Sequence, residues 1–383
     1  MSLESDLEVL LNDVHVNTWR QFQSVKANAS QVWGLKANLA KTWKTPGEPA
    51  FVSELLSTQA LYELRRLIVS DPSFSHFTGK PIVSGCFIHQ KPKVAYGPVA
   101  NPVEIELGDL LLVRHHFTFG QAVPQGRAFL LQAKAANTPR TGKLSADEIE
   151  QFDLYDGWTK KFIFPTGEIA KPGLPTDWDF SGGSQIPVDQ TGIYGVVFND
   201  QLPFKAGRKT RSAFRNGCIW GIGSRDAGDF SSAPKSVEAS NRSLGESLAK
   251  FIRGSFGRTW TSATPLPGDD WSLFIQKMLA NAVDWEYPIQ RLEKIGEKRL
   301  KRLLAFKTLA PVIPYAITHA FRSSFYDSDK APFRTFIKWA DSLESVGSPD
   351  VPRKKPDDKP FPRGGMSTLY IATFGDSSLP NPE

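Results

Sequence analysis

The chain has 383 residues, 40% of them hydrophobic and 22% charged, which is enough apolar sequence for a sizeable core and excludes global disorder. Two cysteines exclude a disulfide framework and a cysteine-rich zinc site. The sequence has no apolar run of about 18 residues, so we expect no membrane-spanning helix. Acidic residues stand near the start, where a signal peptide carries bases, and we expect a cytoplasmic protein. The net charge of +6 is compatible with a polyanionic partner.

Apolar spacing and turn residues predict the order of secondary structure. Leucines and valines recur every three or four residues over 1–45 and again over about 51–69, as is typical of helices, and the stretch TPGEP at 45–49 should separate the two. The motif SADE at 145–148 is typical of a capping box, so a helix should begin there. Apolar runs bounded by Gly, Pro and Asn predict strands at 81–89, 103–113, 127–135, 161–164, 192–199 and 216–223.

The remainder of the chain divides by composition. Helical periodicity returns from 243, while 348–365 is rich in Pro and charge and predicts a linker before a final strand at 366–375. We expect four regions: an N-terminal helical segment at 1–48, a core at 49–235, a helical C-terminal region at 236–347, and a linker with a terminal strand at 348–383.

Three polar residues stand out on the second and third expected strands. Asp109 interrupts an apolar run, and Gln132 and Lys134 stand two residues apart on the following strand. Residues two apart share one face of a strand, so Gln132 and Lys134 should point together. A buried Lys and Gln cost free energy unless a polar group faces them, and the neighbouring acid is a natural partner. A purely structural Asp–Lys ion pair in an α/β sheet is the simplest alternative.

This arrangement resembles the PD-(D/E)xK nuclease superfamily, which has an αβββαβ core with an acid on its second strand and (D/E)-x-K on its third. Asp109 matches the acid, and Gln132, Ala133 and Lys134 match (D/E)-x-K, with Gln in place of the usual carboxylate. Mrr-like restriction enzymes show a similar QxK variant. The resemblance implies an α/β fold with a restriction-endonuclease-like αβββαβ core and helical N-terminal and C-terminal additions.

The helix after the third expected strand carries a further match. Gln151 and Tyr155 fit the QxxxY motif of RecB-type members, and as i and i+4 residues they lie on one helical face. The resemblance covers roughly residues 51–200 and adds both residues to the implied catalytic set.

The implied chemistry is phosphodiester hydrolysis with Mg²⁺ or Mn²⁺, which neutralises developing charge and lowers the pKa of a bound water. Asp109, the side-chain oxygen of Gln132 and the carbonyl of Ala133 would supply the oxygen ligands that Mg²⁺ prefers. Lys134 would orient or help deprotonate the water and stabilise negative charge in the transition state.

Because Gln132 removes one negative charge, we expect another acid nearby. Glu63 lies on the helix before the sheet, on the face of its apolar residues, where family members often place a metal-binding acid. Glu106 is closer to Asp109, although a regular strand would point it to the opposite face unless a bulge at Gly108 corrects this. We favour Glu63 over Glu106; for either, a solvated surface glutamate is the alternative.

Two basic clusters are candidate nucleic-acid contacts, since Lys and Arg neutralise phosphates. One lies on the helical pattern at 289–306, where interleaved acids argue against a membrane-surface helix; for both clusters a solvated face is the alternative. The other cluster comprises Lys205, Arg208, Lys209, Arg211 and Arg215.

We expect His115 and His116 to be exposed histidines at a strand end or phosphate contacts, in preference to metal ligands.

The expected function is that of a metal-dependent nuclease acting on DNA in preference to RNA, in restriction or another bacterial defence role, without membrane association. A homodimer or a partner protein stays open. One alternative is a catalytically degenerate nuclease fold that binds nucleic acid or regulates. The other is a structural or interaction protein of unrelated α/β fold.

Overall fold

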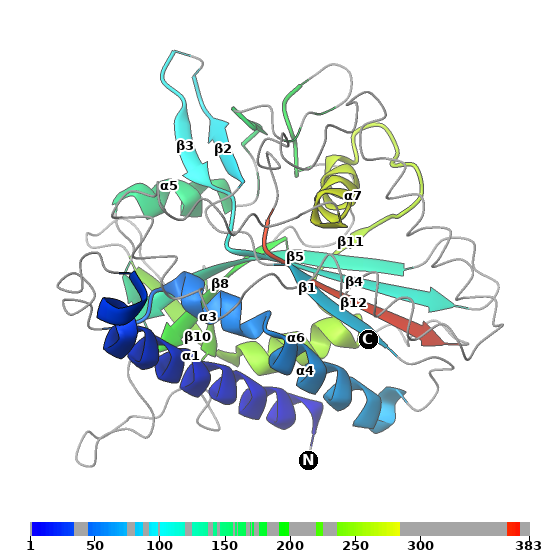
Figure 1. The fold of residues 1–383 in the computed structure, drawn as a ribbon. Helices are drawn as coiled ribbons and strands as arrows, with labels where there is room; N and C mark the ends of the chain where they lie inside the picture. Colours follow the sequence, from blue (N-terminus) through cyan, green and yellow to red (C-terminus); the bar gives the residue numbers. More distant parts are fainter. Residues whose placement is uncertain are drawn as a thin grey trace, which may run out of the picture.

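The protein has a mixed α/β fold in which helices cover both faces of a large sheet (Figure 1). The computed structural model describes residues 2–33, 45–74, 81–86, 92–98, 100–118, 125–136, 141–143, 146–155, 158, 160–165, 169, 171, 176–181, 191–198, 220–224, 236–283 and 366–375. The helices are α1 (Leu3–Trp33), α3 (Glu48–Leu55), α4 (Thr58–Ser70), the 3-10 turn η1 (Pro72–Phe74), α5 (Ala146–Tyr155), α6 (Leu244–Ile252) and α7 (Asp270–Val283).

Two sheets account for the described strands. Nine strands form the large sheet in the order β1-β12-β4-β5-β8-β9-β10-β6, with β11 paired to β5, and β3-β2-β7 form the small one. β4 is antiparallel to β5, and β5 is parallel to β8. The bounds are β1 (Ile82–Cys86), β2 (Lys93–Tyr96), β3 (Val103–Glu106), β4 (Leu110–Thr118), β5 (Gln125–Ala136), β6 (Thr141–Lys143), β7 (Phe162–Ile163), β8 (Gly192–Phe198), β9 (Trp220–Ser224), β10 (Ser236–Ser243), β11 (Arg258–Trp260) and β12 (Thr368–Gly375).

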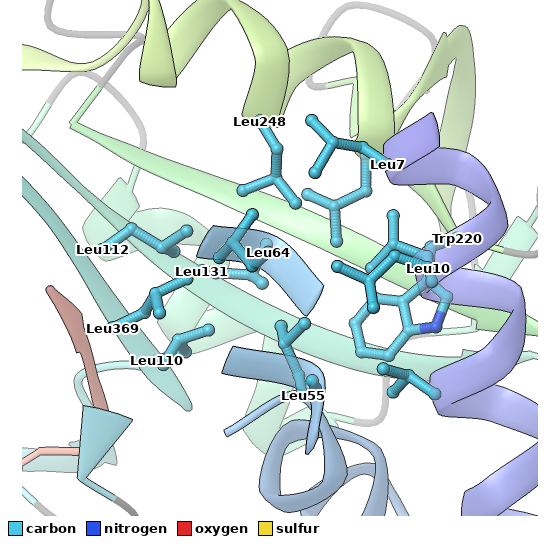
Figure 2. Packing of buried hydrophobic residues seen from close by; sticks show 14 of the residues in the cluster. Leu7, Leu10, Leu55, Leu64, Leu110, Leu112, Leu131, Trp220, Leu248 and Leu369 are labelled. Carbon is cyan, nitrogen blue, oxygen red and sulfur yellow. The ribbon is translucent and has the colours of Figure 1, made fainter. Parts of the chain in front are cut away.

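The large sheet separates two hydrophobic cores, because successive residues of a strand point to opposite faces. On β4, Leu110 and Leu112 belong to the core between the sheet and α1, α3, α4 and α6. Leu111 and Val113 belong to the core on the other face, between the sheet and α5 and α7. Figure 2 shows the first core, where leucines of the helices meet those of the sheet. Each fully buried leucine contributes roughly 1.5–3 kcal/mol. This core combines α1, the central strands, α6 and β12, and thus draws on all four expected regions.

The expected helix at 51–69 is two helices, α3 and α4. Ser57 separates them because its hydroxyl accepts the N–H of Ala60 at 3.2 Å and so caps a new helix. α3 itself begins at Glu48, with Pro49 in its first turn, a position where proline costs no hydrogen bond. The stretch expected only to end the N-terminal helix therefore also starts the next one.

The single strand expected at 103–113 is wrong, because the chain changes sheets at Gly108. β3 ends at Glu106 in the small sheet, and β4 begins at Leu110 in the large sheet. A Cβ on Gly108 would lie 2.9 Å from the hydroxyl of Tyr155, so a glycine is needed where α5 packs against this crossing. The crossing brings residues 107–109 between the two sheets.

The terminal strand expected at 366–375 is confirmed as β12, and it is an interior strand of the large sheet, between the edge strand β1 and β4. It pairs in parallel with β4 and antiparallel with β1. The strands expected at 127–135 and 192–199 are confirmed as β5 and β8. The expected linker and the helical pattern at 289–306 lie outside the described residues. Among the helices that the structure describes, none has the length and hydropathy to cross a membrane.

Candidate functional site

The candidate site lies along one edge of β5, where β4 no longer covers it. The β4–β5 ladder begins at Leu110, opposite Leu131, and β5 continues to Ala136 paired with β8 on its other side. In this part of β5, beyond Leu131, two carboxylates accept hydrogen bonds from backbone N–H groups of the strand. Asp109 Oδ2 accepts the N–H of Ala133 at 2.7 Å, and Glu48 Oε1 accepts the N–H of Ala135 at 3.1 Å. The two acceptors therefore follow the same strand edge.

Asp109 lies just before β4 and is fixed by three hydrogen bonds. Its own N–H donates to the carbonyl of Leu131 at 3.0 Å, which starts the pairing with β5. Its carboxylate accepts from Gln132 Nε2 at 2.5 Å and from the Ala133 N–H. The structure thus brings together Asp109, Gln132 and Ala133, as the sequence predicted, and the side chain of Asp109 is partly buried.

Gln132 and Lys134 share one face of β5, as their spacing predicted, and both are buried, with 5% and 6% of their surface exposed. Their neighbours Leu131 and Ala133 point into the opposite core. The positive charge of Lys134 acts on Asp109, lowering the pKa of its carboxyl against the other influences there. Lys134 therefore supplies a positive charge close to Asp109.

Gln151 and Tyr155 of α5 both reach the crossing between the two sheets. Gln151 Nε2 donates to the carbonyl of Glu106 at 2.6 Å and to Gln132 Oε1 at 2.5 Å. The Tyr155 hydroxyl donates to the carbonyl of Leu107 at 2.6 Å. One helical face therefore holds both the crossing and the first polar residue of QxK in place.

The two acids considered as partners of Asp109 differ in position. The charge of Glu106, the last residue of β3, raises the pKa of Asp109. In place of the bulge considered at Gly108, the chain passes there from the small sheet to the large one. Glu63 instead binds Arg66 at 2.7 Å and Gln59 at 3.2 Å along the surface of α4. The inward orientation expected for Glu63 is replaced by this local pairing, and we do not place it with Asp109.

Glu48 is the site acid that the sequence interpretation missed. It stands at the first residue of α3, where a carboxylate is favoured by the helix dipole, and it reaches β5. Its charge also raises the pKa of Asp109. A signal was present, because Glu directly before Pro after a Gly is typical of a helix start.

Burial and neighbouring charges act together on the Asp109 carboxyl. Burial is the largest influence on Asp109 and, with the charges of Glu106 and Glu48, raises the pKa of its carboxyl well above the usual value, while Lys134 and the Ala133 N–H act in the opposite direction. Burial first, and the charges of Glu106 and Glu48 after it, therefore oppose ionisation of Asp109.

The neighbouring tyrosine stays a hydrogen-bond donor. Burial is the main cause that raises the pKa of Tyr155 well above its usual value, with contributions from Tyr194 and from the charges of Asp109 and Glu106. Tyr155 is thus protonated at neutral pH and keeps its bond to the crossing.

Oxygen atoms are the groups at this strand edge that could hold a metal ion. Asp109, Glu48 and the carbonyl of Ala133 offer oxygen, the ligand type of Mg²⁺, which usually keeps several waters and needs few protein ligands. Gln132 does not fit that set as it stands, since its nitrogen faces Asp109. In the described part of the chain, no group of three or more His, Cys, Asp and Glu side chains is arranged to hold a metal. A cation here would therefore depend on few protein ligands.

The histidine pair is not exposed as expected. His115 and His116 are both fully buried within β4, where the Nδ1 atoms lie 3.0 Å from the Tyr370 hydroxyl and 2.8 Å from that of Thr373. Both partners are on β12, whose insertion beside β4 covers the strand end. Of the basic clusters, Lys205, Arg208, Lys209, Arg211 and Arg215 lie outside the described residues, as does 289–306.

No protein-family model, curated protein or solved structure matches this chain.

Proposed function

We propose that the protein is a divalent-cation-dependent nuclease whose site is the carboxylate-lined edge of β5. The observation that carries the proposal is that Asp109 and Glu48 both accept hydrogen bonds from N–H groups of the same strand edge. The positive charge of Lys134 in addition lowers the pKa of Asp109. Carboxylates with an excess of negative charge beside one lysine are suited to a cation and an anionic phosphodiester.

The order of elements supports this function through the resemblance to the PD-(D/E)xK superfamily. β4 would be the second strand of that core, β5 the third, α5 the helix and β8 the strand parallel to β5. Two departures are specific to this chain: Gln132 replaces a carboxylate, and β12 separates β1 from β4. Neither departure removes Asp109, Lys134 or the carbonyl of Ala133.

Each residue has a chemical task in the proposed reaction. Asp109, Glu48 and the Ala133 carbonyl would hold Mg²⁺ or Mn²⁺, which when bound lowers the pKa of a water and screens phosphate charge. The Lys134 ammonium would orient the water and stabilise negative charge on the phosphate in the transition state. Tyr155 and Gln151 hold the crossing that carries Asp109.

The proposed substrate and setting extend the family resemblance. We favour DNA over RNA, with the basic residues of 205–215 as phosphate contacts, and a cytoplasmic restriction or defence role, alone, as a homodimer or with a partner protein. These assignments are the furthest from the site geometry, and each is open to a direct substrate screen.

A catalytically degenerate nuclease fold is the second candidate, and one observation favours it. The group beside Asp109 is the Gln132 amide nitrogen, a donor, where most members of the superfamily have a carboxylate. In that case the protein would bind nucleic acid without cutting it. The two candidates share the fold and differ in activity.

Cleavage of labelled plasmid and linear DNA in Mg²⁺ or Mn²⁺ separates the two. The nuclease proposal expects cutting that EDTA stops and that Asp109→Ala, Lys134→Ala and Glu48→Gln each reduce at least about a hundredfold, since each group acts on the reacting charge. Glu63→Gln is the matched control, because that glutamate lies in a surface pair, and it should cut like the wild type.

DNA cleavage that survives Lys134→Ala would refute the assignment. DNA binding without cleavage in either metal would favour the degenerate fold.

A further inference from the structure

The hydrogen bonds that link Glu106 to Asp109 have a direction. A backbone carbonyl only accepts, so the Gln151 group 2.6 Å from the Glu106 carbonyl is its NH₂. The same nitrogen lies 2.5 Å from Gln132, so the Gln132 atom that faces it is the oxygen. The other end of the Gln132 amide, its nitrogen, then meets Asp109 Oδ2 at 2.5 Å. The Glu106 carbonyl thereby determines which end of Gln132 faces the site.

We infer that Gln132 and Gln151 are positioning residues: Gln132 holds the Asp109 carboxylate through an N–H donor, and Gln151 fixes that orientation. The inference rests on the proposed function and adds a role for Gln132, which supplies no oxygen to the cation but orients the residue that does. Oδ2 of Asp109 receives both Gln132 Nε2 and the Ala133 N–H, which fixes the rotation of the carboxylate at the strand edge.

The opposite orientation of Gln132 would create two repulsive contacts. Rotating the amide would bring its oxygen to within hydrogen-bond distance of the Asp109 carboxylate, two acceptors facing each other. It would also bring its nitrogen against the nitrogen of Gln151, two donors facing each other. Gln151 cannot rotate in response without turning its own oxygen toward the Glu106 carbonyl. The observed direction is therefore the one in which every contact pairs a donor with an acceptor.

Burial of both glutamines raises the free-energy cost of losing these hydrogen bonds. Gln132 is 5% exposed and Gln151 4% exposed, so a broken bond would leave polar groups unpaired with little access to water. Loss of Gln132 would also remove the 2.5 Å hydrogen bond that its Nε2 donates to Asp109 Oδ2.

Unfolding in EDTA tests the positioning role without any metal. We expect Gln132→Met and Gln151→Met each to raise the unfolding equilibrium constant about tenfold or more, and the double variant to raise it by less than the product, since the two share a bond. Gln59→Met, at an exposed glutamine of α4, should change it less than about threefold. Single variants that unfold like the wild type, or effects that multiply independently, would overturn the inference.

Side-chain amide NMR gives a signature that a general loss of stability would not produce. With ¹⁵N-glutamine labelling, the NH₂ signal missing in Gln132→Met should shift in Asp109→Asn and in Gln151→Met, but stay in place in Gln59→Met. A Gln132 signal indifferent to Asp109→Asn would show that the donor bond does not exist and would overturn the inference.

Mn²⁺ titration separates this inference from the nuclease proposal. A positioning role expects Gln132→Met to weaken Mn²⁺ binding less than about tenfold, and less than Asp109→Asn does. A loss in Gln132→Met equal to that of Asp109→Asn, with wild-type stability in EDTA, would assign Gln132 as an oxygen ligand and refute the positioning role. If the wild type binds no Mn²⁺ and cuts no DNA, the proposed function fails, whereas the EDTA and NMR results still decide the direction of the amide.

Discussion

Gly108 and Tyr155 should be coupled in stability, because the glycine leaves the space that the tyrosine hydroxyl occupies. A Cβ at position 108 would lie 2.9 Å from that hydroxyl and 3.1 Å from the terminal methyl of Met366. The hydroxyl itself donates to the carbonyl of Leu107 at 2.6 Å. Gly108→Ala therefore displaces a bonded group, whereas Gly108→Ala combined with Tyr155→Phe does not.

The magnitudes follow from these contacts. Tyr155→Phe removes the donor from a buried carbonyl and should cost about 1–3 kcal/mol of unfolding free energy. Gly108→Ala alone overfills the site and should cost about 1–3 kcal/mol. In the Tyr155→Phe background only the flexible end of Met366 must move, so the same change should cost under about 1 kcal/mol. The double variant should thus be roughly 1–2 kcal/mol more stable than the sum of the single changes predicts.

Urea unfolding of the four proteins, followed by tryptophan fluorescence in EDTA, measures this coupling. Gly47→Ala is the matched control for a glycine change, since its Cβ would meet only Pro49 at 3.5 Å. Tyr62→Phe controls for loss of a hydroxyl, because Tyr62 is 60% exposed. Additive costs within about 0.3 kcal/mol would refute the close approach of Gly108 and Tyr155.

Three further changes test other parts of the structure. Because the folded-state pKa of Asp109 is raised above 3.8, its ionisation destabilises the fold, so in EDTA the unfolding free energy of the wild type should fall as the pH rises from about 4. Asp109→Asn should remove that fall; equal slopes in pH-dependent urea melts would contradict it. Ile371→Pro in β12 should abolish cooperative thermal unfolding, since this strand pairs on both sides; a melt like the wild type would place β12 elsewhere. Asp270→Ala should cost about 3–5 kcal/mol in urea unfolding, because it removes a buried carboxylate that pairs with Lys171 and accepts the N–H of Asp179. Glu246→Ala at an exposed pair should cost under about 1 kcal/mol; equal costs would contradict the burial of Asp270.

Local features of the chain could be predicted from the sequence because they depend on short-range patterns. The alternation around Gln132 and Lys134 placed both on one face of β5, and the three- and four-residue spacing placed Gln151 and Tyr155 on one face of α5. The same two spacings therefore identified Gln132, which donates to Asp109, and Gln151 and Tyr155, which donate to backbone carbonyls just before it. The hydrogen bonds among these residues join only β5, the residue just before its neighbour β4, and one helix, α5.

Long-range placement could not be predicted in the same way. Nothing local distinguishes a strand at 368–375 that forms the edge of a sheet from one that inserts between two other strands. Its insertion between β1 and β4 buries His115 and His116. The change of sheet at Gly108 depends on contact with Tyr155, far along the chain. Glu48 reaches the site only because α3 packs under β5.

A Mn²⁺ titration followed by electron paramagnetic resonance tests most directly the divalent cation that we propose at the edge of β5. We predict one Mn²⁺ per chain, with affinity reduced at least about tenfold by Asp109→Asn and by Glu48→Gln, and unchanged by Glu63→Gln. Mn²⁺ binding that survives both site changes, or that is lost in Glu63→Gln, would contradict it.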